Sequence, residues 1–357
     1  MALDELFEKV QEEKLSRRTI LKAGAAVGIG LAGATLAGCT SPTPTGTPGP
    51  STSPSATPTP APQTKDTVNV GYLVSDHDAP LFIAIANDYF GKYGVKVNPT
   101  SFSAGGPLVT QIIGGTIDIG IAGIAPVISG VVNDPTVKVY AAVHENGSGL
   151  IVKKGMRIDT IDKLKGNIIA IPGKGSIQDV MLRMLLKANN IDYDRDVTVT
   201  VVPAAQMFQS LEAGSIGAYM AWEPFITQAE HQGIGEVLVR FEQVLPNHPC
   251  DTIVSTTVFA NKYPDSLKGY LKAHKEAIEF IAANPAKAAE ITGGSQWTKV
   301  GTDIEEDAME HIRFLYKPDE DFLAGSERFA QEMKTLGLIK KDVTRADIFD
   351  LTLVNQL

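Results

Sequence analysis

Residues 101–130 constrain the fold most, because they contain two successive strand–turn–helix units. In the first unit an extended run ends at Ser103, and Gly105-Gly106-Pro107 opens an apolar helix that we expect to end near Ile113. A helix that begins where a strand ends presents unpaired N–H groups and a positive dipole end to its surroundings. This local pattern suits a ligand pocket better than a catalytic triad.

The second unit follows directly. Gly114-Gly115 stops the first helix, Ile117–Ile121 predicts a short buried strand, and Gly123 opens another helix with Pro126 in its first turn. Proline is tolerated there because the first N–H groups of a helix have no partner within the helix. Since glycine permits close backbone approach, we expect ligand contacts at these helix starts, although turn geometry alone also explains the glycines. The candidate residues are Gly105, Gly106, Gly123 and Ala125.

Strands and helices alternate on both sides of this stretch. Strands are predicted at Val68–Val74, Val95–Phe102 and Val137–Val143, with a helix at Leu81–Phe90 between the first two. Such alternation predicts an α/β fold with doubly wound sheets and ligand loops at the carboxyl ends of the strands.

The first 39 residues have the order of an export signal. Ser16–Lys22 resembles a twin-arginine motif, Ala23–Gly38 is apolar, and Leu36-Ala37-Gly38-Cys39 resembles a lipobox whose cysteine is lipidated. The following residues, 40–66, are rich in Pro, Ser and Thr and predict a disordered tether. These features predict a domain that is lipid-anchored on the extracytoplasmic face of the cell membrane.

Composition excludes several classes of protein. The chain has 357 residues and a net charge of −9, and it contains no basic run of the kind that binds nucleic acid. Its two cysteines exclude a disulfide scaffold, and no spacing typical of a zinc, haem or iron–sulfur site is present. We therefore expect no cofactor, no metal site and no catalytic residue.

Four segments together resemble a known family, the substrate-binding proteins of ABC importers of the nitrate/sulfonate/taurine type, which also includes thiamin-pyrimidine binders. They are Val70–Val97, Gly115–Gly120 (GTIDIG), Gly173–Ser176 (GKGS) and Trp222–Phe225 (WEPF). The resemblance implies the type II fold of periplasmic binding proteins, in which two lobes joined by two hinge crossings close on a solute. It also implies an ABC permease and its ATPase as partners, and a monomeric protein without enzymatic activity.

The resemblance also implies where the lobes divide. Lobe I would contain residues 67–145 and 246–357, and lobe II residues 146–245, with crossings at His144–Gly149 and Leu245–Pro249. Further elements are predicted as helices at 177–188, 204–213, 264–283 and from 285, strands at 196–202 and 252–259, and amphipathic helix over 302–357.

Two further groups of residues are candidates for solute contact. Ser176 would cap the helix that begins at Ile177, and together with Gly175 it would offer a hydroxyl and N–H groups to an oxyanion, although an ordinary cap looks the same. Ser75, Asp76 and His77 follow the first strand, where His77 could contact an anion or a ring and Asp76 an amine.

Trp222 and Glu223 form the most distinctive pair. Trp222 offers a flat apolar face and one donor to a solute, although it would equally fill the core of its lobe. Glu223 is the second candidate, but its carboxylate would also favour the start of the following helix through the helix dipole, and we favour that structural role. Cys250 would be either a buried small side chain or a residue facing the cleft, with only His248 near it in sequence.

The charge of the solute stays open at this point. The family favours a small anion such as a sulfonate or nitrate, which helix N-termini can hold. The acidic residues near the predicted strand ends would instead suit a nitrogenous ring such as a thiamin-precursor pyrimidine; they are Asp76, Asp78, Glu145, Glu223 and Asp251. A biosynthetic enzyme on the same fold is a further alternative, but the export signal counts against it.

Overall fold

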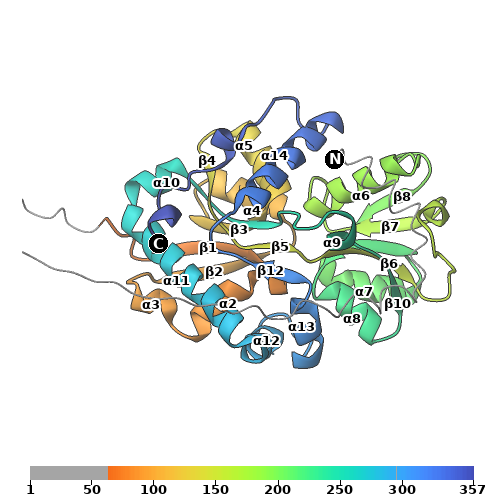
Figure 1. Ribbon diagram of the computed structural model, residues 1–357, viewed down its shortest axis with the longest axis horizontal. Coiled ribbons are helices and arrows are strands. Elements are labelled where there is room, and N and C mark those ends of the chain that lie inside the picture. The colour runs from red at the N-terminus through yellow and green to blue at the C-terminus, as the bar shows by residue number, and fades with distance from the viewer. Residues whose placement is uncertain (1–62, 295) are drawn as a thin grey trace, which may run out of the picture.

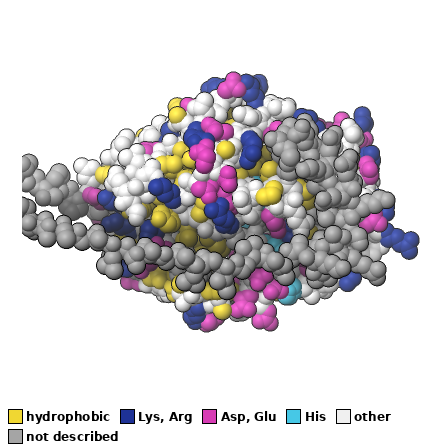
Figure 2. All heavy atoms as spheres, in the orientation of Figure 1, with side chains coloured by type: hydrophobic (Ala, Val, Ile, Leu, Met, Phe, Trp, Pro, Cys, Tyr) yellow, Lys and Arg dark blue, Asp and Glu magenta, His cyan; other side chains and the backbone are white. Residues whose placement is uncertain are grey.

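The computed structural model describes residues 63–294 and 296–357. Two α/β lobes lie side by side, each built on a five-stranded sheet with helices on its faces (Figure 1). On the face shown in Figure 2, the Lys and Arg side chains are interspersed with Asp and Glu. The predicted export signal, Cys39 and most of the predicted tether lie outside the described residues.

The sheet of lobe I has the order β2-β1-β3-β11-β4. Strands β1, β2 and β3 are parallel, whereas β11 is antiparallel to both of its neighbours, so the sheet is mixed. All five residues of β3 are buried, as expected for a central strand covered on both faces. The strands are β1 (Val68–Leu73), β2 (Val97–Phe102), β3 (Ile119–Gly123), β4 (Val137–Ala142) and β11 (Asp251–Thr256).

Helices from both ends of the chain cover this sheet (Figure 1). They are η2 (Asp76–Asp78), α2 (Ala79–Ala86), α3 (Tyr89–Lys92), α4 (Gly105–Ile113), α5 (Ile124–Asn133), α10 (Thr257–Lys262), α11 (Pro264–Ala283), α12 (Pro285–Gly293), α13 (Thr302–Met309), α14 (Glu320–Thr335), α15 (Arg345–Ile348) and η4 (Val354–Gln356).

The sheet of lobe II has the order β10-β6-β9-β7-β8 and is also mixed, because β6 is antiparallel to both neighbours. Its strands are β6 (Ser148–Lys153), β7 (Ile168–Ile171), β8 (Thr198–Val201), β9 (Ala218–Trp222) and β10 (Gly235–Arg240). The associated helices are η3 (Ile161–Leu164), α6 (Ile177–Ala188), α7 (Ala204–Ala213), α8 (Phe225–His231) and α9 (Phe241–Val244).

Two stretches of chain connect the sheets. The first contains β5 (His144–Asn146), which pairs with the C-terminal strand β12 (Ile312–Phe314). The second runs from Leu245 to Cys250 and forms a β-bridge between Pro249 and Glu145 of the first. Both lie between the sheets, and α13 adds contacts to α8 of lobe II. The boundaries predicted for the lobes stay a prediction, and we propose them because they assign each five-stranded sheet to one lobe.

Most elements form where the sequence predicts them. The helices at 105–113, 177–188, 204–213 and 264–283 have the predicted bounds, and α12 begins at Pro285 as predicted. The strand expected at 117–121 is displaced to 119–123, because Asp118 is held by the Lys65 ammonium and the Asn69 N–H before the strand begins.

Three predictions were wrong. The helix expected at 81–90 is two helices, because Asp88 takes a left-handed conformation with φ of 55°. The strand expected at 252–259 ends at Thr256, whose hydroxyl caps α10. The amphipathic helix expected over 302–357 is interrupted by β12, which pairs with β5 in the predicted crossing at 144–149.

The end of the predicted tether packs against the domain. The Lys65 N–H donates to the Ser266 hydroxyl at 2.8 Å, and the Gln63 N–H donates to the Asp265 carboxylate at 2.8 Å. A disordered tether therefore extends to residue 62 at most. Within the described residues, no helix is both long and apolar enough to cross a membrane.

Candidate functional site

A small cavity lies where the two lobes meet. Lobe I contributes Gly105, Gly123 and Pro126 from the starts of α4 and α5, and lobe II contributes Ser176, Ile177 and Gln178 from the start of α6. The rest of the lining consists of Leu73, His77, Trp222, Cys250 and Asp251. The cavity has a volume of about 20 Å3, room for about one water molecule. A larger solute therefore requires the lobes to separate.

The starts of three helices of at least nine residues border this cavity: Gly105 is the first residue of α4, Gly123 is the N-cap of α5 and Ser176 is the N-cap of α6. The Ser176 hydroxyl accepts from the Asp179 N–H at 3.1 Å, which confirms the predicted cap. Among the described residues, the Ser176 hydroxyl has no acceptor for its own hydrogen, which could serve a solute. Gln178, one residue into α6, donates to the Ser148 hydroxyl at 3.0 Å and so ties the helix to β6.

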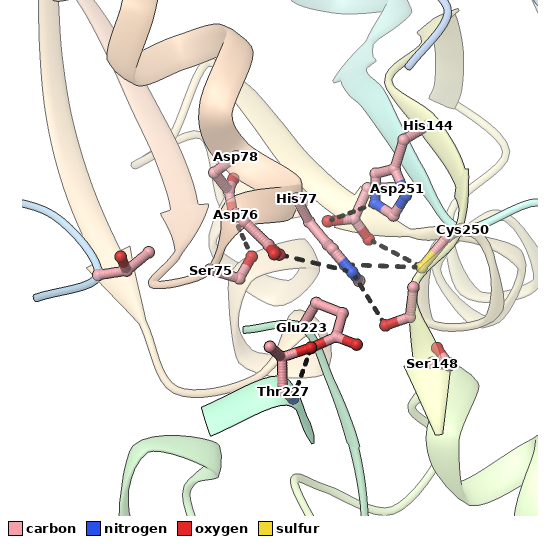
Figure 3. Close-up of polar contacts among 12 residues, drawn as sticks. Ser75, Asp76, His77, Asp78, His144, Ser148, Glu223, Thr227, Cys250 and Asp251 are labelled. Carbon is pink, nitrogen blue, oxygen red and sulfur yellow. Dashed lines mark hydrogen bonds and ion pairs between the residues drawn. The ribbon is translucent and has the colours of Figure 1, made fainter. Parts of the chain in front are cut away.

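Four ligand-type side chains gather on one side of the cavity: His77, His144, Cys250 and Asp251, which we call the His–Cys–Asp cluster (Figure 3). All four residues are buried. His77 comes from η2 after β1, His144 begins β5, and Cys250 and Asp251 lie at the start of β11. The two imidazole rings lie 3.9 Å apart between centroids.

Burial keeps two members of the cluster neutral. The pKa of His77 is well below its usual value, because burial and the neighbouring His144 both disfavour the imidazolium. The pKa of Cys250 is well above its usual value, because burial and the Asp251 carboxylate disfavour the thiolate. The pair therefore lacks the thiolate–imidazolium character of a cysteine nucleophile.

Two carboxyl groups lie beside His77. The Ser75 hydroxyl donates to Asp78 at 3.0 Å, whereas neither carboxylate oxygen of Asp76 has a hydrogen-bond partner among the described residues. Burial raises the pKa of both carboxyl groups, with Glu305 and Glu223 adding to the shift at Asp76 and Asp251 adding to that at Asp78. The acidic character predicted for the strand ends is therefore present, but in buried form.

Trp222 and Glu223 have different roles. Trp222 ends β9, lines the cavity and keeps its indole N–H without a partner among the described residues. Glu223 is buried behind it, where its carboxylate pairs with Arg240 and accepts from the Thr227 N–H at 2.9 Å. Arg240 and the Thr227 N–H therefore hold Glu223 in the structural role that the sequence favoured for it.

The cavity includes five of the eleven residues predicted to contact a solute: His77, Gly105, Gly123, Ser176 and Trp222. The other six do not line it. Gly106 is exposed and Gly175 lies just before the α6 cap, while Ala125 and Glu223 are buried in packing; Ser75 and Asp76 lie behind His77. The predicted residues at the three helix starts therefore line the cavity and their neighbours do not, and contact of any of them with a solute stays a prediction.

Sequence reasoning missed His144, Ser148 and Gln178 as residues of the site. His144 and Ser148 lie in the Gly-rich first crossing, whose sequence indicates only a hinge. Asp251 is predicted only as one of the acidic residues near the strand ends, and the structure places it in the cavity lining. Gln178 carried no signal beyond its place in the first turn of α6.

Several known proteins are similar to this chain in sequence. A bicarbonate transport ATP-binding protein of Synechococcus elongatus, CmpC, is 27% identical over 290 residues, which cover 74% of this chain and 42% of CmpC. The chain thus spans about two fifths of that relative's length. The nitrate/nitrite binding protein NrtA of Synechocystis is 26% identical over 346 residues, covering 88% of this chain and 75% of NrtA.

Solved structures show the same fold. The periplasmic nitrate-binding protein NrtA of Synechocystis superposes with a TM-score of 0.71 at 20% identity, over 83% of this chain and 89% of that one. The alkanesulfonate-binding protein SsuA of Xanthomonas axonopodis, bound to MOPS, superposes with a TM-score of 0.70 at 19% identity, over 80% of this chain and 99% of that one. The fold is therefore that of the type II periplasmic binding proteins. The model of the NMT1-like family matches residues 61–293, so the chain belongs to the NMT1-like family.

Proposed function

We propose that this protein is the solute-binding component of an ABC importer and that its two lobes close around a small solute. The observation that carries the proposal is the cavity, because both lobes contribute to its lining, together with Cys250 at the end of the second connecting stretch. Solute contacts made by both lobes favour the closed arrangement, which a membrane permease with its ATPase would then recognise. The relatives named above for bicarbonate and nitrate support this role.

For the solute we propose a small inorganic or organic oxyanion of the nitrate or sulfonate kind. Gly105, Gly123 and Ser176 place the starts of three helices around the cavity, and helix N-termini favour anions through free N–H groups and the helix dipole. The indole N–H of Trp222 and the amide of Gln178 add donors. Such donors can hold an oxyanion without a formal positive charge.

A nitrogenous ring such as a thiamin-precursor pyrimidine is the second candidate. It is favoured by the Asp251 carboxylate and the Trp222 indole in the lining, which contains no Lys or Arg among the described residues. Membership of the NMT1-like family is compatible with this solute. We propose no enzymatic role, because the neutral Cys250 thiol is a poor nucleophile.

A thermal-shift screen tests the function and separates these solutes. Nitrate, bicarbonate, small alkanesulfonates, pyrimidines and small amines would each be titrated against the full chain. A solute that binds only the folded protein raises the melting temperature with concentration. We expect a saturable rise in melting temperature with one or more oxyanions. A saturable rise with pyrimidines alone would show that the solute is a nitrogenous ring. No rise with any compound would count against solute binding.

We further propose that Cys39 carries a lipid anchor that holds a monomeric protein at the extracytoplasmic face of the membrane. The support is the order of the twin-arginine motif, apolar run and cysteine in residues 1–39. In bacteria that process lipoproteins, the unmodified chain should sediment with membranes and a Cys39→Ser chain should not. Equal distribution of the two chains would contradict the anchor.

A further inference from the structure

The His–Cys–Asp cluster has the composition and spacing of a metal site. Its four ligand atoms lie within 4.8 Å of one another. The Cys250 sulfur is 3.8 Å from Nδ1 of His77 and 3.9 Å from Oδ1 of Asp251, and Nε2 of His144 is 3.9 Å from Oδ2 of Asp251. Four ligands around Zn²⁺ at about 2.0–2.3 Å would stand roughly 3.3–3.8 Å apart, so small side-chain movements would close the site.

Each histidine already has the orientation that metal binding requires. Nε2 of His77 lies 3.2 Å from the Gly147 carbonyl, and Nδ1 of His144 lies 3.3 Å from the Glu145 carbonyl. A carbonyl only accepts, so these nitrogens carry the protons, which leaves a lone pair on Nδ1 of His77 and on Nε2 of His144. Both lone pairs belong to the atoms nearest the rest of the cluster. Metal-binding histidines are commonly fixed by such backbone contacts.

The second, independent observation is a set of buried polar atoms without partners. Nε2 of His144 and Oδ2 of Asp251 are both buried and have no hydrogen-bond partner among the described residues. No Lys or Arg in the described part of the chain forms an ion pair with Asp251. Unsatisfied buried polar atoms are rare and costly, and one cation between these atoms would satisfy both.

We propose that His77, His144, Cys250 and Asp251 bind a divalent transition metal of the zinc type at the edge of the cleft. Two imidazoles, a thiolate and a carboxylate suit Zn²⁺, whereas Mg²⁺ and Ca²⁺ prefer oxygen ligands alone. On binding, the Cys250 S–H bond breaks, the sulfur bonds to the metal and the proton passes to solvent. Four protein ligands make a closed site, which links η2, the first crossing and the start of β11.

Cobalt titration tests this site, and the test does not depend on which solute the protein carries. The full chain would carry Cys39→Ser, which leaves Cys250 as its only thiol, and would be freed of metal with a chelator. We expect one Co²⁺ per chain, with tetrahedral visible bands and a sulfur-to-cobalt band in the near ultraviolet, and stoichiometric displacement by Zn²⁺. Absence of binding, or a six-coordinate spectrum without the sulfur band, would overturn the proposal.

Substitutions of single cluster residues test whether these residues bind the metal. Cys250→Ala should abolish the near-ultraviolet band and His144→Ala should weaken Co²⁺ binding more than tenfold, whereas the exposed His231→Ala should leave both unchanged. Thermal melts without metal check that each variant folds. Should a variant fail to fold, X-ray absorption of the zinc-loaded chain gives the answer directly: one sulfur and three nitrogen or oxygen ligands are expected, and no sulfur ligand would overturn the proposal.

Discussion

Arg240 pairs with Glu223 in a buried ion pair that joins the end of β10 to the segment just after β9. The Glu223 side chain is completely buried and that of Arg240 is 11% exposed. Arg240 also binds Glu230 at 2.6 Å, while Glu223 accepts from the Thr227 N–H. This network fixes the chain directly behind Trp222, and therefore positions the wall of the cleft.

Replacing Arg240 with Met should destabilise the protein strongly. The substitution leaves the Glu223 carboxyl buried without its partner, a situation that costs about 3–5 kcal/mol. Urea unfolding measures the loss. The control is Arg195→Met, whose partner Asp196 lies on the surface and whose loss should cost about 1 kcal/mol or less. Equal effects of the two substitutions would show that the buried pair does not support lobe II.

Replacing Trp222 with Phe should weaken solute binding while the protein stays folded. Phe keeps an apolar ring in the wall but removes the indole N–H, which has no partner among the described residues. A lost hydrogen bond of about 1–3 kcal/mol corresponds to roughly a 5- to 150-fold change in Kd. Calorimetric titration checks this. Trp297→Phe is the control, because Trp297 stacks on Phe82 away from the cavity; an unchanged Kd in Trp222→Phe would remove the indole N–H from the site.

Glu305 should make the protein less stable as the pH rises. It is buried in α13, its carboxyl accepts from the Thr298 hydroxyl at 2.8 Å, and burial, reinforced by Glu223, raises its pKa from 4.5 to about 8. Between these values the unfolded chain has lost the proton that the folded chain retains. The free energy of unfolding therefore falls through this window, by up to about 1.4 kcal/mol per pH unit from this group.

The variant Glu305→Gln tests that dependence. Glutamine cannot ionise, so the variant should gain stability over the unmodified protein at pH 8 and much less at pH 5, as measured by urea unfolding at both values. Glu306→Gln is the matched control, since Glu306 is the exposed neighbour on the same helix. A stability difference that is the same at both pH values would contradict the raised pKa.

The sequence predicted those structural features that depend on residues close together in the chain. Alternating apolar runs and glycine turns were sufficient to predict the helix starts at Gly105, Gly123 and Ser176, because turn and cap preferences depend on only a few neighbouring residues. The family resemblance then supplied the two-lobed architecture, which local patterns alone do not specify.

What escaped prediction depends on contacts distant in sequence. Strand β5 is a strand only because β12, from the other end of the chain, pairs with it. The His–Cys–Asp cluster likewise brings together His77 and Cys250, which are 173 residues apart in the sequence. No short sequence motif indicates that these two residues lie close together. The sequence favours a structural role for Glu223, but it does not indicate that Arg240, 17 residues further on, is its partner.

A substitution at Gly123 tests most directly whether the solute binds where the two lobes close. A methyl group on Gly123 of lobe I would lie 2.8 Å from Cδ1 of Ile177 in lobe II, whereas one on Gly106 would meet nothing within 4 Å. The backbone at Gly123, with φ of −59° and ψ of 147°, accepts any residue. Within lobe I the same methyl group would lie 3.4 Å from Oδ1 of Asp251, so Gly123→Val obstructs closure mainly through Ile177.

The decisive measurement is a calorimetric titration of Gly123→Val, Gly106→Val and the unmodified protein with the solute that stabilises it most. We predict that Gly123→Val raises Kd at least about tenfold, equivalent to about 1.4 kcal/mol, while Gly106→Val binds as the unmodified protein does. Thermal melts without solute verify that both variants are folded. Unchanged affinity in folded Gly123→Val would contradict a solute site between the lobes.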